Sequence, residues 1–437
     1  MIREKNSQDQ KITESFTTHT LDNGLTVLLK EIHSAPVISQ WVWYRVGSRN
    51  EVLGKTGISH WVEHMLFKGT ERFSEQEISQ AIYRNGGDLN GSTYWDWTEF
   101  HETMPANQIG IALEMEADRM VNSRFDSKDV ESERTVILSE KEEDDGDAML
   151  HLMNSVRKAA FPHHPYGREI IGETEDLHGL TRDDLYEYYR TWYAPNNAVV
   201  SIAGYFETEE MLRQIEVAYG NIPARQVPSI IIPPEEPIQK PLRVEEHGPG
   251  DLTDLRISWH VPNTKDPDVP ALTLLNTILA GAVSMNTFEK CSISNRTSRL
   301  FQKLVNDGMA ADVALEYTPS IDPYLVTLLV PVSSGVTIEE VSDIIFEEYK
   351  NIARKGVLPA EIEKARRQAK AMFAYSTENI AIQAQWMGFS SMFADPAWYA
   401  DYLQRLGNVK AEDISRIAGT LFRRDNCVIG VFSAEEE

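Results

Sequence analysis

Cysteine is scarce in this chain, which has only Cys291 and Cys427 among its 437 residues. Neither has the spacing of a zinc finger or a redox pair, and we expect no disulfide between them. Positive charge is also in deficit, with 42 Lys and Arg against 67 Asp and Glu and a formal net charge of −25. Because nucleic-acid binding favours basic surfaces, we expect no nucleic-acid partner. Solubility explains the acidic excess most simply, although an acidic chamber that attracts basic peptides would give the same composition.

Long apolar runs are missing as well. No stretch reaches the roughly 18 apolar residues that a membrane-spanning helix needs. Residues 1–11 lack the apolar core of a signal peptide. We therefore expect no membrane partner and, for the sequence as written, a cytoplasmic location. A periplasmic location is the alternative if a signal peptide was removed.

The length of the chain exceeds that of one ordinary hydrophobic core and indicates more than one domain. A proline-rich stretch near the middle is the best candidate for a linker, because proline interrupts regular structure. We predict an N-terminal domain at 1–222, a linker at 223–243 and a C-terminal domain at 244–437. The prolines of this stretch are Pro223, Pro228, Pro233, Pro234, Pro237 and Pro241.

The sequence after the linker repeats the order of elements before it. Each half has an apolar strand, then a helix, then a pair of extended segments. We therefore predict two homologous halves, of which only the first carries metal-binding histidines. The matching segments are 38–44 with 255–260, 56–67 with 271–281, and 92–104 with 312–317 and 324–330.

The most informative motif is His60-Trp61-Val62-Glu63-His64, which reads H-x-x-E-H. It is the inverted form of the H-E-x-x-H signature of zinc proteases. On a helix, positions i and i+4 share one face, so both imidazoles can point at one metal ion. Glu63 lies near enough to reach a metal-bound water without binding the metal. A zinc-activated water beside a carboxylate base is machinery for hydrolysis.

A third ligand is expected from a second, acidic helix at 126–145. Its residues Glu133 and Glu140 are two helical turns apart and lie on similar faces. From spacing alone, either carboxylate can bind the metal while the other orients a histidine.

These residues and their surroundings resemble the pitrilysin or insulinase family of zinc metallopeptidases, most of all its bacterial and mitochondrial-processing-peptidase-like members. The family's signature is H-x-x-E-H followed by a glutamate 76 positions after the second histidine, and Glu140 stands there. Further family motifs occur in the family's order and cover most of the first half. They are Gly57-Ile58-Ser59-His60, His64-Met65-Leu66-Phe67-Lys68-Gly69-Thr70, Gly86-Gly87-Asp88-Leu89-Asn90, His164-Pro165-Tyr166-Gly167 and Trp192-Tyr193-Ala194-Pro195-Asn196-Asn197.

The resemblance implies an α+β fold of two similar domains, each a mostly antiparallel sheet with helices packed on one side, facing each other across a cavity. It implies Zn²⁺ as the cofactor, bound by His60, His64 and Glu140, with a water in the fourth position. It also implies that Glu63 is the general base, while Glu133 corresponds to an additional acidic residue of the family that either orients a histidine or is merely solvated.

Substrate peptides are expected on an exposed strand edge, which binds a peptide backbone with little side-chain preference. The family strand that pairs with substrate matches Asn90, Gly91, Ser92 and Thr93. The nearby aromatic residues Tyr94, Trp95 and Trp97 either line side-chain pockets or, more commonly for strands, belong to the core. We assign His164 to a turn and not to the metal.

One stretch departs from the family. Many relatives carry an Arg and a Tyr in the second half that steady the substrate carbonyl, and our alignment places Val305 and Ala311 there. Neither side chain can donate a hydrogen bond, and losing one such donor typically costs about 10²–10³ in rate. We predict a heterodimer in which a homologous partner subunit supplies the Arg and Tyr. Substitution by Arg296 or Tyr317 of the same chain is the alternative.

The leading hypothesis is a zinc metalloendopeptidase that hydrolyses unfolded peptides or small polypeptides. The main rival is a non-catalytic structural subunit like the core proteins of respiratory complexes, which usually lose zinc ligands. A peptide-binding or chaperone-like protein with incidental zinc is a third possibility. The Glu63→Gln change separates these hypotheses, because it removes the base and leaves the metal ligands in place.

Overall fold

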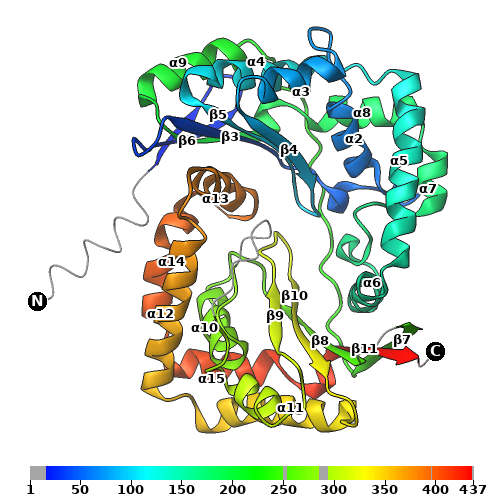
Figure 1. The fold of residues 1–437 in the computed structure, drawn as a ribbon, viewed down its shortest axis with the longest axis vertical. Helices are drawn as coiled ribbons and strands as arrows, with labels where there is room; N and C mark the ends of the chain where they lie inside the picture. The colour runs from blue at the N-terminus through cyan, green and yellow to red at the C-terminus, as the bar shows by residue number, and fades with distance from the viewer. Residues whose placement is uncertain (1–15, 250–252, 285–293, 395, 436–437) are drawn as a thin grey trace, which may run out of the picture.

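The computed structural model describes residues 16–249, 253–284, 294–394 and 396–435. The chain forms two halves, each built on one β-sheet, with the N-terminal half above the C-terminal half in Figure 1. The two sheets lie on either side of a central space, as the α+β prediction of two facing domains requires.

The N-terminal sheet has six strands in the order β1-β2-β6-β3-β5-β4. All neighbouring pairs are antiparallel except β2 and β6. The sheet ends at β4, which among the described strands pairs only with β5 and leaves its other edge open. The strands are β1 (Thr17–Thr20), β2 (Thr26–Glu31), β3 (Val37–Tyr44), β4 (Asp88–Thr93), β5 (Thr98–Pro105) and β6 (Ala198–Gly204).

The C-terminal sheet has five strands in the order β7-β11-β8-β10-β9. Its one parallel pair, β7 with β11, occupies the place of β2 with β6. Without β1, the two sheets therefore have the same order and the same strand directions, which confirms the predicted duplication. The strands are β7 (Leu242–Pro249), β8 (Thr253–Val261), β9 (Ala314–Tyr317), β10 (Tyr324–Val332) and β11 (Cys427–Glu435).

Helices form a layer on the outer face of each sheet (Figure 1). All helices described in the N-terminal half, whichever face they cover, are α2 (Ile58–Leu66), α3 (Glu75–Tyr83), α4 (Ile109–Asn122), α5 (Ser127–Gly146), α6 (Ala148–Ala160), α7 (Thr174–Gly179), α8 (Arg182–Trp192) and α9 (Thr208–Tyr219). The helices described in the C-terminal half are α10 (Val269–Ala280), α11 (Ile338–Lys355), α12 (Pro359–Tyr375), α13 (Ile380–Phe393), α14 (Pro396–Asn408) and α15 (Ala411–Leu421).

The halves exchange one helix each across the central space. Helix α13 of the C-terminal half packs on β3 and β6 of the N-terminal sheet, and α6 of the N-terminal half packs on β7 and β11. Both helices follow the second long helix of their half, so they are equivalent elements. The resemblance predicts helices on one side of each sheet, and this exchange adds a helix of the other half to the second face.

Alternating side chains of the N-terminal sheet explain why it needs both layers. Val42 and Tyr44 of β3 face the outer helices, whereas Trp41 and Trp43 join the core that contains α13. Strand residues point alternately to opposite faces, so both faces of this strand are apolar and must be covered. At the crossing, Gly388 of α13 lies against Trp43, because a Cβ there would be 2.0 Å from Trp43 Nε1.

The expected segments agree closely with the structure near the site. The helix predicted at 56–67 is α2, and the one predicted at 126–145 is α5. The chain from 223 to 240 has no helix or strand, and β7 begins at Leu242, inside the segment predicted as a linker. Cys427 is buried as a free thiol, while Cys291 lies outside the described residues. Among the described residues, no helix is long and apolar enough to cross a membrane.

Candidate metal centre and active site

Helix α2 presents the two histidines of the motif on one face and an apolar face to the core. Trp61, Val62 and Met65 are fully buried under the outer helices. The helix is preceded by Gly57, its N-terminal cap, whose φ of 82° is a left-handed conformation. The carboxylate of Glu51 accepts hydrogen bonds from the backbone N–H groups of Gly57 and Ser59, both at 2.9 Å. It thereby satisfies donors that a helix N-terminus leaves free.

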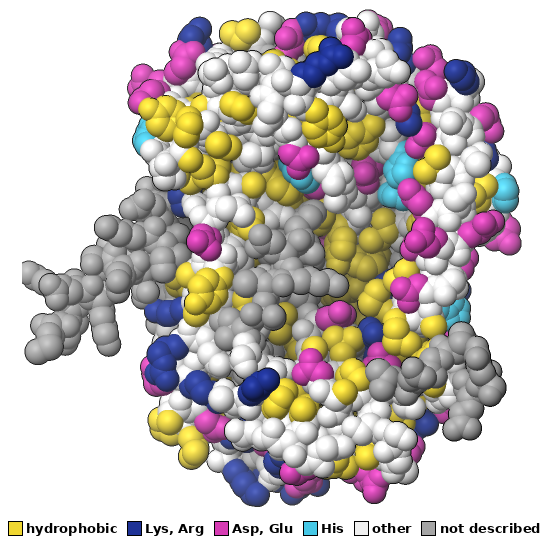
Figure 2. Space-filling view, viewed as in Figure 1, with side chains coloured by type: hydrophobic (Ala, Val, Ile, Leu, Met, Phe, Trp, Pro, Cys, Tyr) yellow, Lys and Arg dark blue, Asp and Glu magenta, His cyan; other side chains and the backbone are white. Residues whose placement is uncertain are grey.

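Helix α5 packs beside α2 and brings two glutamates to the histidines. The guanidinium of Arg134 on α5 lies over the Trp61 ring, 4.6 Å from its centroid, and joins the two helices. Glu133, the residue before Arg134, and Glu140, about two turns after Glu133, both reach the imidazole of His64. In Figure 2, histidine and acidic side chains lie side by side where α2 meets α5.

Three predicted ligands converge on one point. Ring nitrogens of His60 and His64 and a carboxylate oxygen of Glu140 all lie within 4.8 Å of one another. The two Nε2 atoms face each other at 3.2 Å, and His64 Nε2 is 3.7 Å from Glu140 Oε2. Two imidazole nitrogens and a carboxylate, turned toward a common point, are the donor set of a catalytic zinc site with three protein ligands. The residues therefore fit Zn²⁺.

Glu133 orients the ring of His64 by a hydrogen bond to Nδ1, the ring nitrogen that faces away from His60. Its Oε2 is 3.0 Å from His64 Nδ1, and its Oε1 is 2.8 Å from Lys68 Nζ. Because a carboxylate only accepts, Nδ1 carries the proton and Nε2 faces the convergence point. Burial alone would raise the pKa of Glu133, but hydrogen bonds from His64 and Lys68 hold it below its usual value. Lys68 is a partner that the sequence analysis did not assign.

Electrostatics keep the other imidazole neutral. Burial, together with the neighbouring His64, lowers the pKa of His60 to about 3. Burial would also lower the pKa of His64, but the hydrogen bond with Glu133 and the surrounding carboxylates raise it above its usual value. At neutral pH His60 therefore offers a free lone pair, as a metal ligand must.

Glu63 lies beside this cluster and contacts the edge strand. Its side chain is buried, and its Oε2 accepts a hydrogen bond of 2.8 Å from the Thr93 hydroxyl. Burial raises the pKa of Glu63 to about 7, against the lowering effect of that hydrogen bond. A carboxyl group with a pKa near neutrality can both take and release a proton at physiological pH.

All four residues predicted to bind substrate lie on β4. Of these, Thr93 reaches Glu63 beside the cluster, whereas the exposed Asn90 side chain accepts from the Gly91 N–H at 2.9 Å. Gly91 lies tightly against Phe100 of β5, where a Cβ would be 2.9 Å from the ring. The open edge of β4 thus runs toward the cluster and ends beside Glu63.

The remaining predicted residues lie elsewhere. Trp95 and Trp97 are buried, which favours a core position over a substrate pocket. Tyr317 is buried in the C-terminal core, and Arg296 is exposed. His164 caps a turn, because its Nδ1 accepts from the Tyr166 N–H at 3.1 Å, as predicted.

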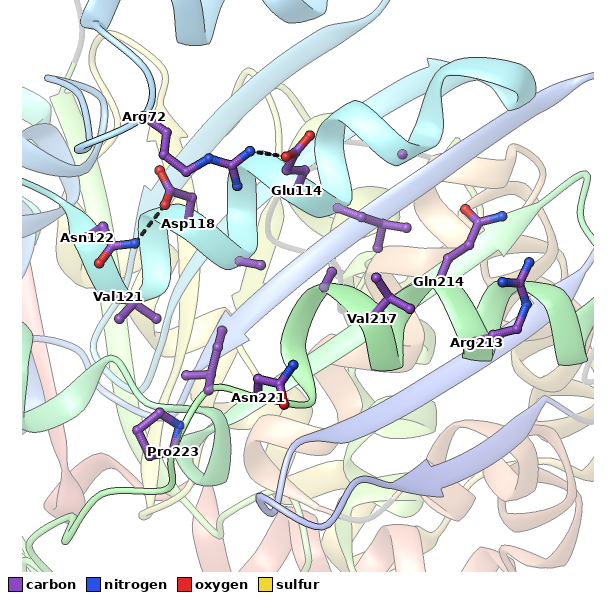
Figure 3. Close-up of a pocket in the computed structure, with 15 residues that line it drawn as sticks. Arg72, Glu114, Asp118, Val121, Asn122, Arg213, Gln214, Val217, Asn221 and Pro223 are labelled. Carbon is purple, nitrogen blue, oxygen red and sulfur yellow. Dashed lines mark hydrogen bonds and ion pairs between the residues drawn. The ribbon is translucent and has the colours of Figure 1, made fainter.

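A groove of about 620 Å³ lies between α4 and α9, away from the cluster (Figure 3). Polar and charged side chains, including Arg72, Glu114 and Asp118, stand around it, and Arg72 is paired with Glu114. None of the predicted site residues lines this groove.

Similarity to known proteins agrees with the fold and the motif. Residues 26–174 match the family model described as insulinase, peptidase family M16, and residues 179–369 match its inactive-domain model. An uncharacterised zinc protease, YmxG of Bacillus subtilis, is 26% identical and aligns over 93% of this chain and 96% of its own length. A probable mitochondrial-processing peptidase subunit beta of Schizosaccharomyces pombe is 27% identical over 96% of this chain and 91% of its own.

A solved structure of a protease from Helicobacter pylori covers 96% of this chain and 99% of its own, with a TM-score of 0.87 and 24% identity. At that identity the likeness speaks for the fold, which is a two-domain peptidase fold. The chain belongs to the insulinase family, peptidase family M16.

Proposed function

We propose that this chain is a zinc metalloendopeptidase that hydrolyses unfolded peptides or small polypeptides. The observation that carries the proposal is the convergence of His60, His64 and Glu140 within 4.8 Å, beside a buried Glu63. Two relatives of similar length are named a zinc protease and a processing peptidase subunit, which supports the same chemistry.

Each residue has a distinct task in this mechanism. A zinc ion held by His60, His64 and Glu140 would supply the Lewis acidity that makes water a nucleophile at neutral pH. Glu63 takes a proton from the attacking water on a carboxylate oxygen and passes it to the leaving amine nitrogen. Thr93 holds that carboxylate in place through the bond to Oε2.

Peptide substrates bind along the open edge of β4 in this proposal. Backbone N–H and C=O groups of an edge strand can pair with an extended peptide, so affinity comes from the main chain. Because β4 ends at Thr93, a peptide added to it passes directly beside Glu63. Only a flexible chain can adopt this extended form, which favours unfolded substrates.

A homologous partner subunit completes the site in our proposal. Val305 and Ala311 take the positions at which the resemblance implies the carbonyl-steadying Arg and Tyr, and neither has a donor side chain. Tyr317 is buried in the core and does not present its hydroxyl to a substrate. One similar protein is named as a subunit, which is consistent with a heterodimer.

The test compares wild type with Glu63→Gln, using a quenched fluorescent peptide library with and without a homologous partner subunit. We expect wild type to cleave only with the partner, and Glu63→Gln to bind zinc normally but lose about 10²–10⁴ in rate. Glu142→Gln, at an exposed position of α5, is the matched control and keeps full activity. Cleavage by the chain alone would contradict the requirement for a partner subunit. Zinc binding without cleavage, both with and without the partner, would favour a non-catalytic subunit.

A further inference from the structure

The tip of the β4–β5 hairpin, residues 94–97, is held by the C-terminal half. The carboxylate of Asp96 accepts a hydrogen bond of 2.9 Å from the backbone N–H of Ile321, which belongs to the loop between β9 and β10. The Tyr94 hydroxyl lies 3.4 Å from that of Thr318 in the same loop. The hairpin therefore carries Thr93 on one strand and an interdomain contact at its tip.

Tyr166 of the His164-Pro165-Tyr166-Gly167 motif joins the two sides of this contact. Its hydroxyl donates to the Asp96 carboxylate at 2.8 Å and accepts from the Asp322 N–H at 3.1 Å. Tyr166 is only 1% exposed, so water cannot replace these bonds without opening the interface. The family motif, which the sequence analysis assigned to a turn, thus has a second role between the halves.

Asp322 extends the contact to the segment that leads into α2. Its Oδ2 accepts from Arg49 Nε at 2.6 Å and lies 3.1 Å from His164 Nε2. Arg49 in turn donates its backbone N–H to the Trp95 carbonyl at 2.9 Å. Two residues after Arg49 comes Glu51, which binds the first N–H groups of the histidine-bearing helix.

We propose that Asp322 and Tyr166 are positioning residues of the active site. Through Asp96 and Arg49 they fix the hairpin that carries Thr93 and the segment that leads into α2. The C-terminal half thereby fixes the position of Glu63 relative to the peptide-binding edge of β4. This inference rests on the proposed peptidase function for its consequence in rate. The cluster of Arg49, Asp96, His164, Tyr166 and Asp322, called here the interdomain cluster, contains none of the metal ligands.

The decisive variant is Tyr166→Phe, with Tyr189→Phe as the matched control. The Tyr189 hydroxyl also makes one donated and one accepted bond to buried groups, to the Arg119 carbonyl at 2.9 Å and from the Ser123 N–H at 3.2 Å. Both tyrosines are buried, so each change removes a hydroxyl that donates and accepts a hydrogen bond in the interior. Only Tyr166 touches the hairpin tip.

Hydrogen exchange of metal-loaded protein gives a readout that does not depend on cleavage. We expect amides of β4 and of residues 94–97 to exchange about tenfold faster in Tyr166→Phe, since a hydrogen bond to a charged group is worth about that factor. Tyr189→Phe leaves that segment at the wild-type rate. Zinc affinity, measured by competition with a chelator, stays within about twofold in both variants, because neither change touches a ligand, Glu133 or the Glu51 bonds that start α2.

Peptidase assays with the partner present then test the consequence. Tyr166→Phe and Asp322→Asn are expected to lose about tenfold or more in kcat/KM, because small misplacements of catalytic groups are costly. Tyr189→Phe is expected to retain wild-type kinetics. Unchanged hydrogen exchange in the hairpin of Tyr166→Phe would overturn the positioning role. Faster exchange in Tyr166→Phe, together with no cleavage by the wild-type protein, would leave that role standing and reject the peptidase.

Discussion

Glu133 shows how much one buried carboxylate does at the residue scale. It lies between His64 and Lys68, with contacts of 3.0 and 2.8 Å to the two side chains. The lysine neutralises its charge, and the carboxylate fixes the tautomer of the histidine. Its sequence neighbour Glu131 is exposed and pairs only with Arg134 among the ion pairs of the described chain.

We predict that Glu133→Gln weakens zinc binding by about 10–100-fold, the usual effect of losing a group that orients a metal-bound histidine. A glutamine side chain carries no charge and has one acceptor oxygen, whereas Glu133 uses one oxygen for His64 and the other for Lys68. The imidazole therefore becomes less well oriented. Competition with a chromogenic chelator measures the change. Glu131→Gln is the control, and equal zinc affinities for the two variants would contradict the orienting role.

Glu51 gives a prediction about pH. Burial raises the pKa of Glu51 to about 7, although N–H groups of Gly57 and Ser59 hydrogen-bond to it. A group whose folded pKa exceeds its unfolded value binds protons more tightly in the folded state, so its contribution to stability falls as pH rises. The loss occurs between the unfolded pKa, about 4.3 for glutamate, and about 7.

We therefore expect the difference in unfolding free energy between metal-free wild type and Glu51→Gln to depend on pH. Wild type loses on the order of 1.4 kcal/mol per pH unit relative to the variant between pH 5.5 and 7, and nothing further above about pH 8. Urea unfolding at several pH values measures this difference. A difference that stays constant over the range would show that Glu51 does not titrate there.

At the scale of single elements, helix α2 depends on the residue that precedes it, Gly57. Gly57 has a positive φ, and a Cβ there would lie 2.3 Å from the Ile171 carbonyl oxygen. Glycine alone fits this position without strain. The family motif that begins at Gly57 thus has a local steric reason.

Gly57→Ala is expected to lower the unfolding free energy by about 2–3 kcal/mol and to weaken zinc binding, because α2 must shift to relieve the contact. Gly110→Ala in α4 is the control, since a Cβ there meets nothing within 4 Å. In that helix, alanine should stabilise by roughly 0.5–1 kcal/mol. Thermal unfolding with and without zinc separates the two effects, and equal stabilities would be inconsistent with a steric role for Gly57.

The exchange of α6 and α13 sets the architecture at the scale of the whole molecule. Each helix covers the second face of the opposite sheet, so neither half buries its own core alone. Helix α6 also follows α5 directly, at Asp147, whose side chain caps it. The docking of α6 on the C-terminal sheet therefore bears on the position of Glu140, seven residues earlier.

Gly388→Ala tests this exchange. The added methyl group would lie 2.0 Å from Trp43 Nε1 and 2.5 Å from Ser201 Oγ, so α13 must move away from the N-terminal sheet. Overpacking of this kind typically costs about 1–3 kcal/mol. We expect lower thermal stability and faster proteolysis between the halves. Gly407→Ala in α14, where a Cβ meets nothing within 4 Å, serves as the control; equal behaviour of the two variants would contradict close docking of α13.

Local patterns sufficed for much of the candidate site. The i, i+4 spacing of His60 and His64 and the two-turn spacing of Glu133 and Glu140 are properties of single helices, so the faces they share follow from sequence. The duplication was also visible, because each half repeats the same order of elements. The choice of Glu140 over Glu133 for the metal came from the family's spacing, since periodicity treats both alike.

What tertiary structure alone decided are the contacts between distant segments. No local sequence pattern predicts the contact of Lys68 with Glu133 or that of Thr93 with Glu63. The same holds for the contacts of the β9–β10 loop with the hairpin tip, because all of them depend on how sheets and helices pack. The helix exchange was equally hidden, since an apolar helix reads the same whichever sheet it covers. The sequence by itself determined the candidate ligands and the elements that carry them, and packing decided how those elements meet.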